Sequence, residues 1–185
     1  MTIRFALFPI MAIVAASALA QAPSAPPSPA TPPPACAAPE HRQFDFWVGY
    51  WDVYPTGKTK LVAHSLIEKL YSGCTIRENW MPLSGSTGGS LNMYDPGDKR
   101  WHQTWHDNSN SRAEFDGGLV DGKMVLTGYW KDVLGPGQSA WMRIVWTRNP
   151  DGSVRQAGDQ STDHGQTWQS NFEFTYKKSA GAPPK

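Results

Sequence analysis

The sequence predicts an all-β protein, an antiparallel up-and-down β-barrel of about ten strands. Short runs rich in β-branched and aromatic residues follow one another between turn signals, and no helix-length periodic segment separates them. The 185 residues include 17 Gly and 9 Trp, a composition typical of an aromatic-rich β protein with many tight turns. Consecutive antiparallel strands in this number avoid exposed edges best by closing into a barrel, and a two-sheet sandwich is the main alternative.

The two ends of the chain differ in composition from the middle. Four segments are predicted: a signal peptide (1–20), a Pro/Ala-rich linker (21–40), the β-barrel domain (41–178) and a flexible tail (179–185). The signal combines Arg4, an apolar run over 5–16 and small residues at 18–20, and the run is short for an uncleaved membrane anchor. We therefore expect a periplasmic or secreted protein with no stable membrane insertion once the signal is removed.

The first predicted strand lies in residues 44–54, which hold six aromatic residues. Trp51 and Val53 fall on one face of this strand, because strand side chains alternate between faces. Gly49 removes a side chain where the chain must bend or approach another backbone closely. The aromatics before Gly49 do not alternate, which suits a short helical turn that plugs one end of a barrel.

The later strands are expected where similar runs lie between turn signals. They cover residues 60–70, 74–81, 90–94, 100–107, 112–120, 123–130, 139–147, 154–161 and 166–176. Asp121-Gly122 is the strongest hairpin signal, and Pro and Gly supply the φ angles for turns at 95–98 and 149–152. Residues 83–89 read as a Gly/Ser loop.

Residues 161–168, Ser-Thr-Asp-His-Gly-Gln-Thr-Trp, match the Asp-box pattern of sialidase propellers. A single copy in a chain this short does not make a propeller. We predict a structural role, in which Asp163 caps backbone amides, Gly165 takes a positive φ and Trp168 packs beneath the turn.

Cys36 and Cys74 are the only cysteines. In an exported chain, two cysteines most simply form one disulfide, here worth roughly 3–4 kcal/mol in the chain-entropy model. The alternatives are a catalytic thiol or a metal ligand. His41 is the only His near Cys36, and a zinc site needs more ligands at short spacing, so no metal site is predicted.

The charge excludes some classes of partner. Charged residues make up 18% of the chain, the formal net charge is +1, and the basic residues are scattered. The sequence therefore predicts no basic surface of the kind that binds nucleic acid. The sequence contains no nucleophile elbow, phosphate loop, dinucleotide fingerprint or HExxH zinc motif.

Residues 101–107 carry the richest set of functional side chains. Alternation places Trp101, Gln103, Trp105 and Asp107 on one face and His102, Thr104 and His106 on the other. With the first face inside, the lumen becomes a pocket with aromatic walls and a few fixed polar groups. The opposite assignment puts the two His inside, where they could serve acid–base roles.

Other strands also alternate polar residues with aromatic ones, which favours a polar and aromatic lumen over a solid core. Glu78 lies between apolar neighbours, either as a buried carboxylate paired with an Arg or as a site residue. The predicted ligand-binding residues are Trp51, Trp80, Asn92, Tyr94, Trp101, Gln103, Trp105, Arg143 and Gln156. The catalytic candidates are Glu78, Asp107, His102 and His106.

Several segments together resemble an exported bacterial family of unassigned function. They are FDFWVGYWDV at 44–53 and residues 67–69, 73–80, 90–95, 101–105 and 167–168. Gly49-x-Trp51 is also similar to the first strand of lipocalins and other calycins. The resemblance implies a calycin-like barrel with small apolar or aromatic ligands, and it supplies no catalytic residues. A nitrobindin-like haem barrel is similar in outline, and haem stays a minor alternative because its proximal His is not matched to a residue here; no cofactor is predicted.

Three functions remain open on sequence grounds. The leading hypothesis is a barrel that binds a small hydrophobic or aromatic molecule in its lumen. The second is a small periplasmic enzyme of lyase, isomerase or hydrolase type that uses acid–base residues in the same lumen. The third is a structural envelope protein, and a homodimer is compatible with each.

Overall fold

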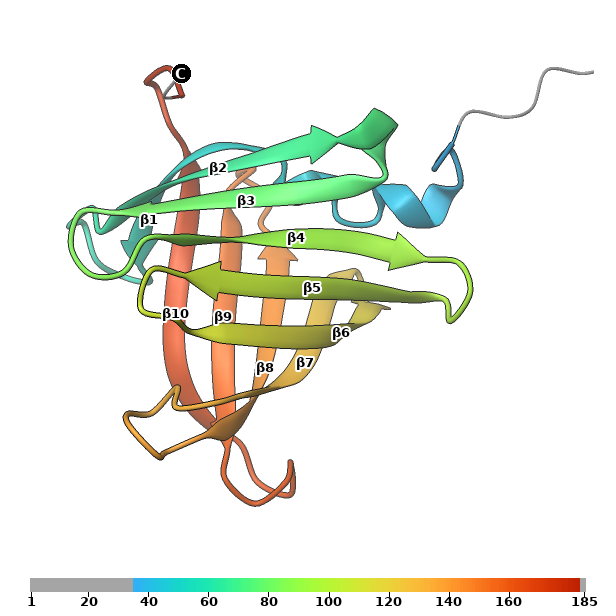
Figure 1. Ribbon diagram of the computed structural model, residues 1–185. Coiled ribbons are helices and arrows are strands. Elements are labelled where there is room, and N and C mark those ends of the chain that lie inside the picture. The colour runs from blue at the N-terminus through green and yellow to red at the C-terminus, as the bar shows by residue number, and fades with distance from the viewer. Residues whose placement is uncertain (1–34, 184–185) are drawn as a thin grey trace, which may run out of the picture. The chain divides into compact units, whose positions relative to one another are not determined.

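The computed structural model describes residues 35–183, which form a closed barrel of ten antiparallel strands (Figure 1). Each strand pairs with its neighbours in the chain, and β1 pairs with β10 to close the sheet. The strands are β1 (Gly49–Pro55), β2 (Ala63–Leu70), β3 (Thr75–Pro82), β4 (Gly88–Asp95), β5 (Arg100–Asp107), β6 (Arg112–Val120), β7 (Lys123–Trp130), β8 (Ala140–Arg148), β9 (Val154–Ser161) and β10 (Gln169–Lys178). The described residues also form three short 3₁₀ helices, η1 (Pro39–Arg42), η2 (Asp45–Trp47) and η3 (Tyr71–Gly73). The closure confirms the predicted fold class and excludes the two-sheet sandwich.

The turn signals place most strand boundaries. Asp121 and Gly122 both have positive φ (49° and 75°), as a two-residue hairpin turn requires, and β6 and β7 have the predicted bounds. The predicted end of the loop at 83–89 is wrong, because β4 already begins at Gly88 and pairs with β3 from that residue on. A side chain at Gly89 would overlap the backbone of Glu78, so a glycine pair permits this close approach. The predicted signal peptide and the linker up to residue 34 lie outside the described residues.

One end of the barrel, here called the closed end, is filled by aromatic side chains from Phe44, from η2 and from the strands around them. Phe44 stacks on Trp47 with ring centroids 4.9 Å apart and lies edge-on to Trp101 and Trp146 at 5.7 and 5.2 Å. Trp51 donates a hydrogen bond from Nε1 to the carbonyl oxygen of Trp47 at 2.8 Å. All five side chains are 1% exposed or less. Burying a large apolar side chain is worth about 1.5–3 kcal/mol, so this plug is a major part of the core.

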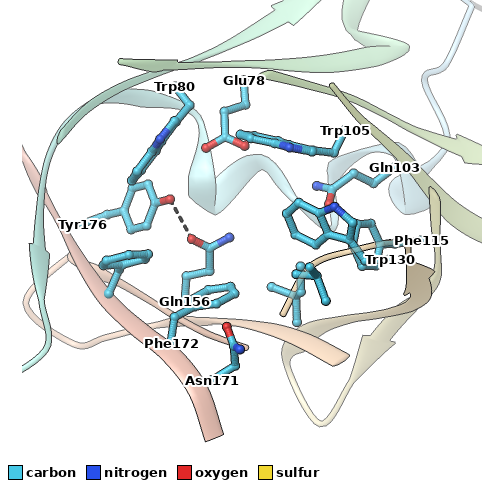
Figure 2. Close-up of a pocket in the computed structure, with 13 residues that line it drawn as sticks. Glu78, Trp80, Gln103, Trp105, Phe115, Trp130, Gln156, Asn171, Phe172 and Tyr176 are labelled. Atoms are coloured by element: carbon cyan, nitrogen blue, oxygen red, sulfur yellow. Dashed lines mark hydrogen bonds between the residues drawn. The ribbon is translucent and has the colours of Figure 1, made fainter. Parts of the chain in front are cut away.

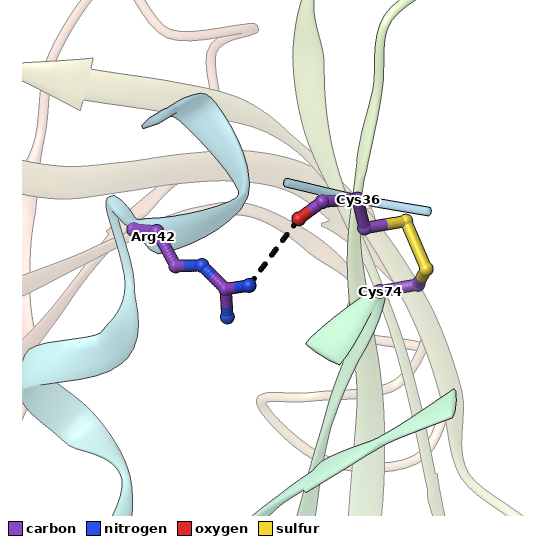
Figure 3. Close-up of a disulfide and its surroundings, with 3 residues drawn as sticks. All are labelled: Cys36, Arg42 and Cys74. Atoms are coloured by element: carbon purple, nitrogen blue, oxygen red, sulfur yellow. Dashed lines mark hydrogen bonds between the residues drawn. A yellow bond between two sulfur atoms is a disulfide. The ribbon is translucent and has the colours of Figure 1, made fainter. Parts of the chain in front are cut away.

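A disulfide between Cys36 and Cys74 fastens the segment before η1 to the start of β3 (Figure 3). The two Cα atoms are 5.1 Å apart, and both cysteines of the chain are in this bond. Arg42 adds a hydrogen bond from Nη2 to the carbonyl oxygen of Cys36 at 3.4 Å. The predicted pairing is confirmed, and the thiol and metal-ligand alternatives for these two residues are excluded.

The Asp-box segment forms the loop between β9 and β10. Asp163 accepts hydrogen bonds from the backbone amide of Thr167 at 2.9 Å and from the hydroxyls of Ser161 and Thr167, both at 2.6 Å. Gly165 has φ +84°, and a side chain there would touch the ring of Trp168. The predicted structural role of this motif is confirmed.

In the part of the chain that the structure describes, no helix has both the length and the apolar character needed to cross a membrane.

Candidate functional site

A cavity of about 260 Å³ occupies the half of the barrel opposite the closed end (Figure 2). Its aromatic walls come from Trp80, Trp105, Phe115, Trp130, Phe172, Phe174 and Tyr176. Its polar groups are Glu78, Gln103, Gln156 and Asn171, and Val133 and Ile144 complete the lining. Val133 belongs to the loop between β7 and β8, so this loop contributes to the cavity lining.

Contacts between side chains hold the aromatic walls together. Trp105 and Trp130, on β5 and β7, lie with ring centroids 6.2 Å apart, and Trp105 donates from Nε1 to Asp107 at 3.2 Å. Across the cavity, Phe172 stacks on Phe174 at 5.4 Å. The ring of Phe172 lies over Gly158 on β9, where any side chain would overlap it.

Glu78 lies at the centre of a buried polar network built from four neighbouring strands, β2 to β5. Its Oε1 accepts a hydrogen bond from Ser65 on β2 at 3.1 Å, and its Oε2 accepts one from Ser90 on β4 at 3.2 Å. Ser90 in turn accepts from Asn92 at 3.0 Å, and Asn92 accepts from Gln103 on β5 at 2.6 Å. The chain of donors therefore runs from Gln103 to the carboxylate.

The network compensates only part of the desolvation of Glu78, which is 5% exposed. Burial raises the pKa of Glu78 to about 7, although the hydroxyls of Ser65 and Ser90 lower it. Glu78 is therefore close to half ionised at neutral pH, which makes it able to give or take a proton there.

Tyr176 and Gln156 form a second polar pair on the opposite wall. The Tyr176 hydroxyl donates to Gln156 Oε1 at 2.7 Å, which directs the amide nitrogen of Gln156 away from the tyrosine (Figure 2). Burial raises the pKa of Tyr176 well above its ordinary value of 10, and the charge of Glu78 raises it further. Tyr176 therefore stays a neutral donor at physiological pH.

The structure brings together five of the residues that the sequence selected. Glu78, Trp80, Gln103, Trp105 and Gln156 all line the cavity. Asn92 lies behind them, with no exposed surface, and bonds to Gln103 and Ser90.

Three of the predicted ligand-binding residues belong to the closed end and not to the cavity lining. Trp51 and Trp101 are packed in the aromatic plug, and Trp101 donates to Gln43 Oε1 at 3.1 Å. Tyr94 packs against Trp101 at 6.3 Å and edge-on to His41 at 5.4 Å. The alternation of side chains correctly placed all three residues inside the barrel. It does not show whether an inward side chain lies in the aromatic plug at the closed end or in the cavity.

The assignment of Arg143 to the lumen is wrong. The buried side chains of β8 are those of Ala140, Met142, Ile144 and Trp146. Arg143 lies between two of them in the sequence, so its side chain points outward. There it bonds to Asp159 at 2.8 Å and lies over the ring of Trp168 at 4.5 Å.

His102, His106 and Asp107 are also outside the cavity lining. His102 lies on the outer face of β5, within 2.9 Å of Asp98 and 2.6 Å of Asp116, and His106 is exposed. Asp107 ends β5 and accepts hydrogen bonds from the amide and hydroxyl of Ser109, so it caps the following turn. These contacts leave Glu78 as the one catalytic candidate in the cavity.

A small acidic group on the outside of the barrel has ligand atoms close together. Asp95, Asp98 and His102 place theirs within 4.8 Å of one another around the β4–β5 turn. Both carboxylates are exposed, and Asp95 and Asp98 already accept backbone hydrogen bonds within the turn. Turn formation accounts for this arrangement.

Several cavity residues were missed in the sequence. Phe172, Phe174 and Tyr176 recur at every second position, and this spacing could have identified them as one inner face. Trp130 stands at the end of its strand, and Ser65 and Ser90 carry no signal of their own. The two serines become visible only when strand pairing places them beside Glu78.

A comparison with models of protein families finds none that matches this chain, and a search of curated proteins also finds no match.

Proposed function

We propose that this protein binds a small organic molecule of one or two rings in the open half of its barrel. The observation that carries the proposal is the cavity of about 260 Å³, with aromatic walls and three buried polar side chains that converge on it. Pockets of this kind, apolar with a few placed polar groups, are the usual form of a small-molecule site. An apolar cavity of about 150 Å³ already holds benzene, so this one has room for a ring and a short chain or a second ring.

We also infer that the protein works outside the cytoplasm. The Cys36–Cys74 disulfide supports this inference, because such bonds persist in oxidising compartments. N-terminal sequencing of the exported protein should find a chain that begins at Gln21, and a chain that begins at Met1 would contradict the predicted processing.

A fluorescence screen can test ligand binding, because Trp80, Trp105 and Trp130 line the cavity and report on its contents. A compound that quenches them is then titrated against Trp105→Ala and Trp141→Ala. Trp141 lies on the outer face of β8 and is 36% exposed, so it is a matched control. We expect Trp105→Ala to weaken binding by about 10- to 100-fold, the scale for losing a buried aromatic contact, and Trp141→Ala to leave it unchanged.

Circular dichroism must show that both variants fold, and Trp105→Phe replaces Trp105→Ala if that variant does not. Equal effects of the inner and outer substitutions, or a screen without a single ligand, would contradict the proposal.

A second candidate function is acid–base catalysis in the same cavity. The observation that favours it is Glu78, whose pKa of about 7 is the value at which a general acid or base works best near neutral pH. If one of the ligands is turned over, Glu78→Gln should reduce kcat by roughly 100-fold or more. Turnover that is unchanged in Glu78→Gln would exclude this role.

A further inference from the structure

Glu78 brings a negative charge into a cavity that has no positive one. Among the described residues, the cavity lining contains no Lys, Arg or His. Arg143, the expected partner, is on the outer face with Asp159. A buried carboxylate without a countercharge is costly, and proteins normally pair it.

The hydrogen bonds around Glu78 favour its ionised form. Ser90 accepts from Asn92, so its own proton is directed to Glu78 Oε2, while Ser65 donates to Oε1. Asn92 is fixed in turn by Gln103. An ionised carboxylate has about four acceptor sites, so two bonds leave about two free for another donor.

Aromatic rings lie on either side of this carboxylate. Trp80 and Trp105 flank Glu78 in the cavity, and Tyr176 and Trp130 lie further along the walls (Figure 2). Aromatic rings attract cations through their π faces, and Trp does so more strongly than Tyr or Phe. Trp105 donates a hydrogen bond from Nε1 to Asp107 at 3.2 Å, and Trp130 donates one from Nε1 to Ser111 at 2.6 Å. These bonds hold both indole rings in place.

We propose that the ligand is a small organic cation, an ammonium group on a short chain from an aromatic ring, whose N–H groups bond to Glu78. This proposal rests on the proposed ligand-binding function. The ammonium supplies the missing countercharge, and the ring fills the aromatic part of the cavity. Gln103 donates through its amide nitrogen to Asn92, which leaves its carbonyl oxygen as a further acceptor for the ammonium. An anionic ligand would meet the charge of Glu78 and no cationic group.

Matched probes test the charge preference. Tryptamine, tryptophol and indole-3-propionate share one ring system and carry a cationic, a neutral and an anionic end, and phenethylamine, 2-phenylethanol and 3-phenylpropionate repeat the series with one ring. Calorimetry on the full protein at pH 8 is suitable, because Glu78 is then mostly ionised and a primary amine, like that of Lys, is still protonated. We expect the amine to bind at least tenfold more tightly than the alcohol, and the carboxylate to bind weakest.

Glu78→Gln keeps the shape of the side chain and removes its charge. We expect it to weaken amine binding at least tenfold and to leave alcohol binding unchanged or stronger. Glu68→Gln is the control, because Glu68 pairs with Arg77 on the outside of the barrel. This variant should leave the affinities for the amine, the alcohol and the carboxylate unchanged.

Proton release gives a readout that a change in packing would not produce. At pH 5.5 most Glu78 is protonated, so amine binding should release a proton, seen as a binding heat that depends on the buffer. The groups that face Glu78 from other strands are the hydroxyls of Ser65 and Ser90 and, on β10, Tyr176, whose pKa is far too high to titrate here. The alcohol should release no proton, and neither should the amine with Glu78→Gln.

The outcomes separate the two proposals. If the alcohol or the carboxylate binds as tightly as the amine, the cation proposal is overturned and the ligand-binding function stands. If neither series binds and the fluorescence screen also finds no ligand, both proposals fall.

Discussion

Ser90 on β4 lies directly across the strand ladder from Glu78 on β3, and its hydroxyl donates to Glu78 Oε2 at 3.2 Å. The pairing places a small hydroxyl donor within hydrogen-bond distance of the carboxylate. It also connects the carboxylate to Asn92 and Gln103, so this one ladder position links Glu78 to the rest of the polar network.

Ser90→Ala should raise the pKa of Glu78 above its wild-type value of about 7. The substitution removes a donor that favours the ionised carboxylate, while the desolvation that disfavours it remains. Asn92 keeps its bond to the carbonyl of Ile76 at 3.1 Å, so the strand ladder should survive. A pH titration followed by the ¹³C resonance of the Glu78 carboxyl measures the shift. Ser170→Ala, an exposed serine on β10, is the control, and an equal pKa in wild type and Ser90→Ala would contradict the role of this hydrogen bond.

Glu78 should also make the stability of the barrel depend on pH. Its folded-state pKa of about 7 is above the value of 4.5 expected in the unfolded chain, so the protonated form is the one that folding favours. This contribution is full below pH 4.5 and is lost as the pH rises through 7. Glu78→Gln does not titrate, so its stability relative to wild type should rise by on the order of 3 kcal/mol between pH 4.5 and pH 8.

Urea unfolding at both pH values measures this difference, since most other groups titrate alike in the two proteins. Glu114→Gln, exposed on β6, should show no such trend. A stability difference between wild type and Glu78→Gln that is independent of pH would mean that Glu78 is not buried in its ionised form.

Most strand boundaries could be predicted from the sequence to within a few residues because turns are local. Asp121-Gly122 needs two positive φ angles, and only a few residue types supply them without strain. The placement of Glu78, Gln103 and Trp105 inside the barrel was accessible for a related reason, because alternation links each polar residue to aromatic neighbours two positions away.

Alternation could not decide the rest of the site. It groups Arg143 with Trp141 but does not say whether that face points in or out, and only the pairing of β8 with β7 and β9 decides this. Alternation also does not show how far along the barrel an inward side chain lies, so Trp51 and Trp101 were predicted to line the cavity although both pack in the aromatic plug at the closed end. The partners of Glu78 depend on contacts between three strands, which a single strand pattern does not contain.

The disulfide should account for a large share of the stability at the closed end. Replacing both Cys36 and Cys74 by Ser opens a loop with a sequence separation of 38 residues, which should cost roughly 3–4 kcal/mol of unfolding free energy. The barrel itself should still form, because Lys69 and Asp45 remain paired at 2.6 Å and η2 keeps its aromatic contacts. Urea unfolding of the double variant and of wild type, each with and without reductant, measures the loss. Reductant should destabilise only the wild type, and a double variant as stable as oxidised wild type would contradict the prediction.

Asp163→Asn should loosen the loop between β9 and β10 and lower the melting temperature. Asp163 accepts hydrogen bonds from Ser161 and from the amide and hydroxyl of Thr167, and these bonds hold its pKa well below the ordinary value of 3.8.

A depressed pKa of Asp163 means that its stabilisation of the fold is present above about pH 4 and is lost progressively as the pH falls below that value. The melting temperatures of wild type and Asp163→Asn should therefore differ at pH 7 and converge toward pH 2, whereas Thr162→Ala, an exposed neighbour, should match wild type throughout. Trp168 packs on this loop under Arg143, so its fluorescence should become more accessible to quenchers in Asp163→Asn. A melting difference that does not become smaller between pH 4 and pH 2 would show that the loop depends on the shape of this side chain and not on its charge.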